Sequence, residues 1–337
     1  MNSTVKNSYK NASNFSFVCC IEAGRLEHQT CLMVSTFRKN AGEELKDSLI
    51  YAISGRTGPK LSEETKQFLK NHNVEIINAY TYNPKPWFNY SNKIAAVSWA
   101  QENLHSKYLG WLDSDILIAG DFTKNLPSEF DFVGRCDSHS PVITENDQKY
   151  LKYWMKLCQI INCNYDDIPW IYLEEANKKV KLYFNSGFFV WRKKSNFANL
   201  YRLNFIKLID SKVATIDGSA WFADQVIISP IIISSKLKWH HLNTLDHHMV
   251  FSGHITGVDA AASMNNSNLI HYSKSLSNPN KLKMMNRLKL ENKKIFDDIN
   301  EFENKFPQKI HNKKIFNLKI IYRKLKTIIF MKTLKNF

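Results

Sequence analysis

The sequence predicts an α/β fold, with a mostly parallel central sheet that helices cover on both faces. Apolar segments of strand length alternate with segments of helical periodicity, and turn residues separate them. This alternation favours parallel strands joined by right-handed helical crossovers. The chain has 337 residues, of which 44% are hydrophobic and 13% aromatic, and this is ample for a folded core.

The first half of the chain predicts three pairs of strand and helix, followed by a fourth strand. Each strand is a short apolar run. The second helix opens on Ser62, which can cap its amino end, and two acids follow in its first turn. In chain order the elements are strand 15–21, helix 26–38, strand 48–54, helix 62–71, strand 74–78, helix 90–103 and strand 107–118.

The second half predicts further strands and helices without an internal repeat. The strand at 182–191 is apolar but is interrupted by small polar residues, as the strand at 107–118 is interrupted by acids. In chain order the elements are strand 130–135, helix 147–163, strand 182–191, helix 199–210, helix 219–228 and strand 268–272.

The basic charge lies mainly at the C-terminus. The formal net charge is +15, and 281–337 holds 16 Lys and Arg against 5 acids, a net of +11. From Lys305 onward there are ten basic residues and no acid, interleaved with Ile, Leu and Phe at near-helical spacing. Such a segment resembles an interfacial helix that binds an anionic membrane surface through 305–337. The alternative is a terminal helix that packs on the domain or on another subunit, and no specific nucleic-acid partner is expected.

Composition also predicts the compartment. No run of about 18 apolar residues exists, and the first residues form no signal peptide, so we expect a cytoplasmic protein, peripheral at the inner face of a membrane. Six cysteines without paired C-x-x-C spacing predict buried free thiols rather than zinc or disulfides.

Two aspartates interrupt the apolar strand at 107–118. Asp113 and Asp115 are two positions apart, so on one continuous strand their side chains point the same way. A buried pair of like charges is costly without a cation between them, and Mg²⁺ or Mn²⁺ held by carboxylates usually completes its shell with phosphates. This pattern predicts a metal-dependent enzyme acting on a diphosphate. The alternative is a strand end whose acids cap the next turn.

Four short motifs in order carry a resemblance to a known family. They are Leu112-Asp113-Ser114-Asp115, Phe184-Asn185-Ser186-Gly187, Ala223-Asp224-Gln225 and Ile270-His271-Tyr272. Together they resemble the glycosyltransferases with a GT-A fold and, more narrowly, family 8, the retaining group that includes glycogenin and the lipopolysaccharide galactosyltransferases. The resemblance implies a GT-A domain at 13–280, between a flexible segment at 1–12 and a basic amphipathic helical tail at 281–337.

The same resemblance implies a metal site. Asp113 would touch both the metal and the ribose or sugar of the donor, Asp115 would be the main metal ligand, and His271 the third. Two carboxylates and an imidazole suit Mn²⁺ more readily than Mg²⁺. The implied donor is a nucleotide-diphosphate sugar, a UDP-sugar. The expected acceptor is a glycan, and the membrane location predicted for the basic tail makes a lipid-linked glycan the natural form of it.

Asn185, Ser186 and Gly187 match the family segment that lies against the donor sugar, with Gly187 allowing close approach of the backbone. The alternative is a bulge or strand turn. Asp224 and Gln225 match the pair that binds the sugar hydroxyls and lies beneath the anomeric carbon. The alternative interpretation of this pair is structural: an acid in the first turn of a helix is favoured by the helix dipole.

Two lysines are further donor-binding candidates. Lys93 matches a basic family position near the nucleotide. The alternative is that Lys93 is a solvated charge on the surface of its helix. Downstream of His271, the family's glycine and its lysine-proline-tryptophan, which clasps the diphosphate, are absent from this sequence. Lys274 or Lys281 can take the place of the missing family lysine in binding the diphosphate.

The implied reaction is transfer of a hexose with retention, in which Gln225 lies under the sugar face opposite the acceptor. An inverting enzyme would instead use Asp224 as general base.

Three other classes of protein are possible alternatives: a sugar nucleotidyltransferase, a non-catalytic carbohydrate- or membrane-binding protein on the same fold, and a nucleic-acid-binding protein. A sugar nucleotidyltransferase needs a glycine-rich loop directly after the strand at 15–21, and this sequence has only Gly24 there.

Overall fold

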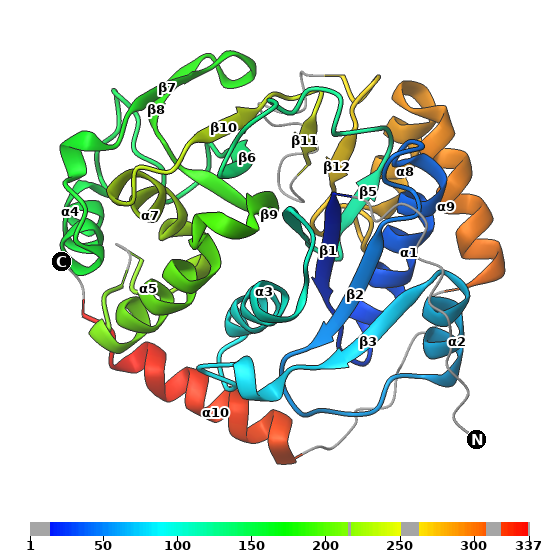
Figure 1. Cartoon of the computed structure of the whole chain (residues 1–337), viewed down its shortest axis with the longest axis horizontal. Helices are drawn as coiled ribbons and strands as arrows, with labels where there is room; N and C mark the ends of the chain where they lie inside the picture. The colour runs from blue at the N-terminus through cyan, green and yellow to red at the C-terminus, as the bar shows by residue number, and fades with distance from the viewer. Residues whose placement is uncertain (1–13, 215–216, 251–262, 308–317, 336–337) are drawn as a thin grey trace.

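The computed structural model describes residues 14–214, 217–250, 263–307 and 318–335. Its centre is a seven-stranded sheet with the order β10-β6-β9-β4-β1-β2-β3 (Figure 1). The strands are β1 Phe15–Cys20, β2 Leu49–Ser54, β3 Val74–Asn78, β4 Tyr108–Leu112, β6 Phe132–Cys136, β9 Phe184–Arg192 and β10 Trp239–Leu242.

The sheet is mostly parallel, and the predicted fold class is confirmed. β1 pairs in parallel with β2 and β4, and β2 with β3. β9 is antiparallel to both β4 and β6, so the sheet is mixed at its centre. Because β9 carries the segment Asn185 to Gly187 beside the end of β4, this antiparallel pairing brings two of the sequence motifs together.

Helices cover both faces of the sheet (Figure 1). β4 shows why the strands are apolar throughout: Leu109 and Trp111 belong to one buried cluster, while Tyr108 and Leu112 belong to the other. One layer contains α1 Arg25–Asn40, α2 Glu63–Asn71, α8 Lys281–Glu291 and α9 Lys293–Lys305, and the other contains α3 Ser91–Asn103, α4 Leu151–Ile161, α5 Phe197–Ser211, α6 Ala223–Val226 and α7 Ile228–Ser234.

A small second sheet stands beside the large one, with the order β11-β12-β5. β5 Ile116–Ile118 is antiparallel to β12 Leu269–His271, and β11 His247–Met249 is parallel to β12. A separate hairpin joins β7 Trp170–Leu173 and β8 Lys178–Lys181.

Several sequence predictions need correction. The strand predicted at 107–118 is two strands, β4 and β5, in different sheets. The helix predicted at 219–228 is the two short helices α6 and α7, which adjoin at Ile227, and Pro230 lies in the first turn of α7, where its missing N–H is tolerated. The strands β7, β8, β10 and β11 were not predicted, because each has only three or four residues, and β8, β10 and β11 are rich in Lys or His.

The C-terminal segment is helical where it is described. Helix α9 packs against α1 and α8 packs against α9, and the two helices bury Met284, Leu288, Ile295, Ile299 and Phe302 in the core. Helix α10 Leu318–Lys332 lies along the lower edge of the molecule (Figure 1). The predicted segment 1–12 and residues 308–317 and 336–337 of the predicted tail lie outside the described residues. In the described part of the chain, every helix is too short or too polar to cross a membrane.

The packing of α8 predicts a contrast between two leucines two positions apart. Leu288 is fully buried and Leu290 is 86% exposed. We expect Leu288→Ala to lower the free energy of unfolding by about 2–5 kcal/mol, because it leaves a cavity in the core. We expect Leu290→Ala to change it by less than about 0.5 kcal/mol. Urea unfolding measures both, and equal effects of the two substitutions would contradict this packing.

Candidate active site

Asp113 and Asp115 lie in the turn that connects β4 to β5. β4 ends at Leu112 and β5 begins at Ile116, so the prediction that one continuous strand carries both aspartates is wrong. The backbone N–H of Asp113 donates to the carbonyl of Gly187 on β9 at 2.8 Å, which fixes the turn against the central sheet. The turn, rather than strand alternation, therefore orients the two carboxylates.

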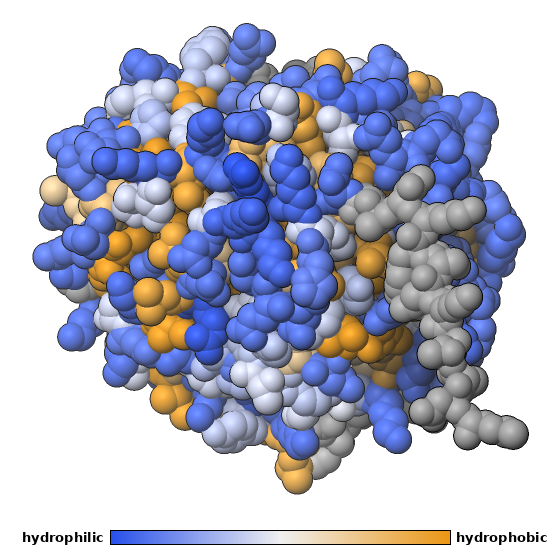
Figure 2. All heavy atoms as spheres, in the orientation of Figure 1, coloured by the Kyte–Doolittle hydropathy of each residue, from blue (hydrophilic) through white to orange (hydrophobic). Residues whose placement is uncertain are grey.

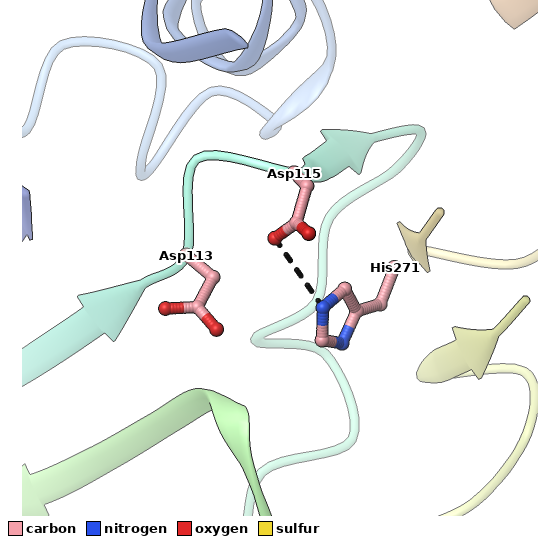
Figure 3. A group of neighbouring side chains, drawn as sticks. All are labelled: Asp113, Asp115 and His271. Carbon is pink, nitrogen blue, oxygen red and sulfur yellow. Dashed lines mark ion pairs between the residues drawn. The ribbon is translucent and has the colours of Figure 1, made fainter. Parts of the chain in front are cut away.

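The register of the small sheet brings His271 to this turn. His271 pairs with Ile116 across β12 and β5, and the N–H of Tyr272 donates to the carbonyl of Asp115 at 3.0 Å. The imidazole Nε2 is 3.4 Å from Asp115 Oδ1, and the carboxylate of Asp113 faces the same space (Figure 3). One ligand atom from each of Asp113, Asp115 and His271 lies within 4.8 Å of the others. Two carboxylates and an imidazole are a suitable ligand set for Mn²⁺.

Burial and mutual charge shift the pKa of each of these groups. Burial raises the pKa of the Asp113 carboxyl to about 6, although Lys93 opposes the rise. Burial alone would also raise the pKa of Asp115, but the adjacent His271 lowers it overall. The pKa of His271 is raised, because Asp115 outweighs the effect of burial. Without a metal, the site therefore favours a protonated imidazole, and a bound cation would release that proton.

Lys93 supplies a buried positive charge beside the turn. It lies on α3, and its Nζ is 2.9 Å from Asp224 Oδ2 and 3.4 Å from Asp113 Oδ1. The same ammonium donates to the carbonyl oxygen and the hydroxyl of Ser186 at 2.7 and 2.8 Å. The alternative of a solvated charge is therefore wrong for Lys93, which is buried among carboxylates.

Two amide side chains are held by a carboxylate that the sequence analysis did not identify. Asp137 Oδ2 accepts from Nδ2 of Asn185 at 2.9 Å and from Nε2 of Gln225 at 3.1 Å. The Gln225 carbonyl in turn accepts from the N–H of Ser186 at 3.1 Å, and Ser186 donates its hydroxyl to Asp224 at 2.9 Å. Asp137 follows β6 directly, as Asp113 follows β4, and this repeated position was the available signal.

Gly187 and Lys274 are two further residues of the predicted donor site. A Cβ on Gly187 would lie 2.3 Å from Cε1 of His271, so in this structure the glycine leaves room for the imidazole. Lys274 lies in the turn after β12 with an exposed side chain. In the described part of the chain, no hydrogen bond or ion pair joins that side chain to the cluster.

A protein-family model described as a Rhodobacterales glycosyltransferase domain matches residues 17–236, more than half of the chain. The chain belongs to this glycosyltransferase family. The prediction of a transferase enzyme is therefore confirmed, and the family favours sugar transfer over nucleotidyl transfer or nucleic-acid binding. No curated protein matches the sequence significantly.

Solved structures of glycosyltransferases resemble this glycosyltransferase at low identity. The bifunctional glycosyltransferase WbbM matches with a TM-score of 0.52 and 13% identity, over 87% of this chain and 52% of WbbM. This similarity supports the GT-A prediction at the level of the fold, and the chain spans about half the length of WbbM. GlyE of Streptococcus pneumoniae matches at a TM-score of 0.48 and 13% identity, over 86% of this chain and 64% of GlyE. The galactosyltransferase LgtC matches at a TM-score of 0.42 and 11% identity, over 76% of this chain and 86% of LgtC.

The burial of Lys93 predicts a large loss of stability in the variant Lys93→Met. Removing the ammonium leaves Asp113 and Asp224 as neighbouring carboxylates without their shared cation, which we expect to lower the free energy of unfolding by about 3–5 kcal/mol. Lys85→Met is the matched control. It breaks the ion pair of Lys85 with the mostly exposed Asp210 and should cost less than about 1 kcal/mol. Chemical denaturation compares the two variants, and equal losses would contradict the role assigned to Lys93.

Proposed function

We propose that this glycosyltransferase moves a hexose from a nucleotide-diphosphate sugar, a UDP-sugar, to a glycan or lipid-linked acceptor. The observation that carries the proposal is the convergence of Asp113, Asp115 and His271 within 4.8 Å of one another at the end of β4. These residues would hold a divalent cation, Mn²⁺ or Mg²⁺. When bound, such a cation neutralises charge on a departing diphosphate.

Lys93 contributes a second, permanent positive charge to the site. Its ammonium already contacts Asp113 and Asp224, so it balances part of the carboxylate charge that remains beside the cation. Because this charge is buried and fixed, it acts in a low-dielectric site without reorganising. In our proposal, Lys93 acts by keeping Asp113 ionised and oriented toward the donor.

Asn185, Asp224 and Gln225 are the proposed contacts for the donor sugar. Asp224 Oδ2 is occupied by Lys93 and Ser186, while its buried Oδ1 has no hydrogen-bond partner in the described part of the chain and can accept from a sugar hydroxyl. Two hydrogen bonds fix the amide of Gln225. Its carbonyl oxygen keeps a second lone pair, which can stabilise positive charge at the anomeric carbon.

This arrangement favours retention over inversion. An inverting enzyme needs a carboxylate that can take a proton from the acceptor hydroxyl. The candidate base, Asp224, is 1% exposed and is already paired with Lys93 at 2.9 Å. Because Lys93 and Ser186 already hold Oδ2 of this carboxylate, we assign Asp224 to sugar binding. Gln225 then takes the position beneath the anomeric carbon.

A membrane surface is the proposed location of the acceptor. Leu318, Tyr322, Leu325 and Ile329 recur at spacings of four and three on α10 and are each more than half exposed. Figure 2 shows hydrophobic side chains among hydrophilic ones at the lower edge, where Figure 1 places α10. An apolar stripe flanked by lysines suits adsorption to anionic lipid. Cosedimentation with vesicles containing phosphatidylserine, compared with neutral vesicles, tests this contact.

The proposal predicts that sugar transfer depends on both aspartates of the turn. With Mn²⁺ and a panel of UDP-, GDP- and CDP-sugars, we expect nucleotide release from a UDP-sugar by the wild type and its loss on chelation. Asp113→Asn and Asp115→Asn should each lower kcat/KM by about 10²–10³-fold, the usual cost of removing a group that stabilises developing charge. The exposed Asp147→Asn should keep the wild-type rate. Full activity of the double Asn variant without metal would contradict the proposal.

A further inference from the structure

Helix α10 packs on the rest of the molecule, as one alternative for the basic tail predicts. Thr327 Oγ1 donates to the carbonyl of Trp87 at 3.0 Å, and the Phe330 ring lies 4.9 Å from that of Trp87. Just after the helix, the carbonyl of Lys335 accepts from the N–H of Ala214 at 3.0 Å. These contacts fix the C-terminal half of α10 and the residues after it against Trp87 and Ala214, so its N-terminal half has a defined position.

A cavity of about 860 Å³ lies between α10 and the carboxyl ends of three parallel strands. Its inner wall includes Glu22, which follows β1 closely, Ser54, which ends β2, and Asn78, which ends β3. Ligands of open α/β sheets bind at this edge. The outer wall is formed by α10 through Ile320, Arg323, Lys324, Thr327 and Ile328.

Basic side chains predominate among the charged residues that line the cavity. One of them, Arg323, has a hydrogen-bond donor without an acceptor among the described residues. Glu22 is the one acid among the described residues that line it, and this carboxylate already forms an ion pair with Arg56. Burial and the nearby Arg56 lower the pKa of Arg323. Nη1 of Arg323 is buried and lacks a hydrogen-bond partner in the described part of the chain. A buried guanidinium donor without a partner is costly, so this position is suited to an anionic or carbonyl oxygen of a ligand.

The inner wall of the cavity adjoins the carboxylate cluster. Glu22 Oε1 accepts from Nδ2 of Asn92 at 2.6 Å, and Asn92 precedes Lys93 on α3. Lys93 in turn contacts Asp113. The cavity wall and the carboxylate cluster are therefore neighbours in the fold, joined through Glu22, Asn92 and Lys93.

We propose that α10 completes the donor site: Arg323 donates to the nucleotide part of the donor, which α10 covers against the strand ends. Ile320 and Ile328 line the same wall and supply apolar contact for a nucleobase. This inference rests on the proposed use of a nucleotide-diphosphate donor. It assigns the face of α10 that carries Arg323 to donor binding, and it leaves the exposed stripe of the same helix on the opposite side available to the membrane.

Calorimetric titration of the full chain with UDP, GDP, CDP and ADP, each with MnCl₂, tests the inference. We expect the wild type to bind one of these nucleotides, and Arg323→Gln to weaken that affinity by about 10- to 100-fold, the cost of a hydrogen bond to a charged group. Arg323→Lys, which keeps the charge, should restore part of the affinity. The matched control is Lys332→Gln, because Lys332 is exposed on the same helix and does not line the cavity.

Each outcome decides a separate point. If Arg323→Gln binds the nucleotide as tightly as the wild type, or if Lys332→Gln loses as much affinity, the inference is overturned and the proposed function stands. If the wild type binds none of the four nucleotides, the proposed donor fails and the inference fails with it. Should Arg323→Gln not fold, as judged by its melting curve, Ile320→Glu places an acid on the same wall and should give a loss of similar size.

Discussion

Negative charge concentrated at the end of β4 is the constraint around which the site is built. Asp113, Asp115 and Asp224 lie close together in a largely buried setting, where unpaired carboxylates cost several kcal/mol each. Lys93 balances part of the negative charge of Asp113 and Asp224. The side formed by Asp115 and His271 has no such permanent cation in the described part of the chain. A bound divalent cation at that side would complete the charge balance, and in our proposal the same charge serves sugar transfer from a diphosphate.

The topology explains why residues far apart in the sequence meet at this point. The carboxyl ends of β1, β2 and β4 open on one edge of the sheet, and the antiparallel β9 brings Ser186 and Gly187 back to that edge. β12 then adds His271 through its register with β5, and α10 closes the adjoining cavity. The charged groups of the site therefore come from the strand ends of the sheets and from α3 and α6, whereas in our proposal the terminal helix supplies the surface that covers the donor.

Much of this arrangement was predictable from local sequence patterns. Apolar runs located the central strands, and four motifs in order identified the aspartates, the amides and His271. The remainder depends on contacts between distant segments, which local patterns do not encode. A lysine on a helix gives no local sign that it is buried, so Lys93 had two open interpretations. The break between β4 and β5 follows from the pairing of β5 with β12, about 150 residues later in the printed sequence. The docking of α10 was one of two alternatives for the basic tail. Asp137 was missed although it follows β6 directly, as Asp113 follows β4.

A crystal structure of the wild type grown with MnCl₂ and UDP tests the central claim most directly. The claim is that Asp113, Asp115 and His271 together bind one divalent cation next to the charge supplied by Lys93. The account predicts one manganese anomalous peak among these three side chains, with the diphosphate of UDP on its open side. Bound UDP with no manganese peak at the three residues, or with the peak at another group of ligands, would contradict it.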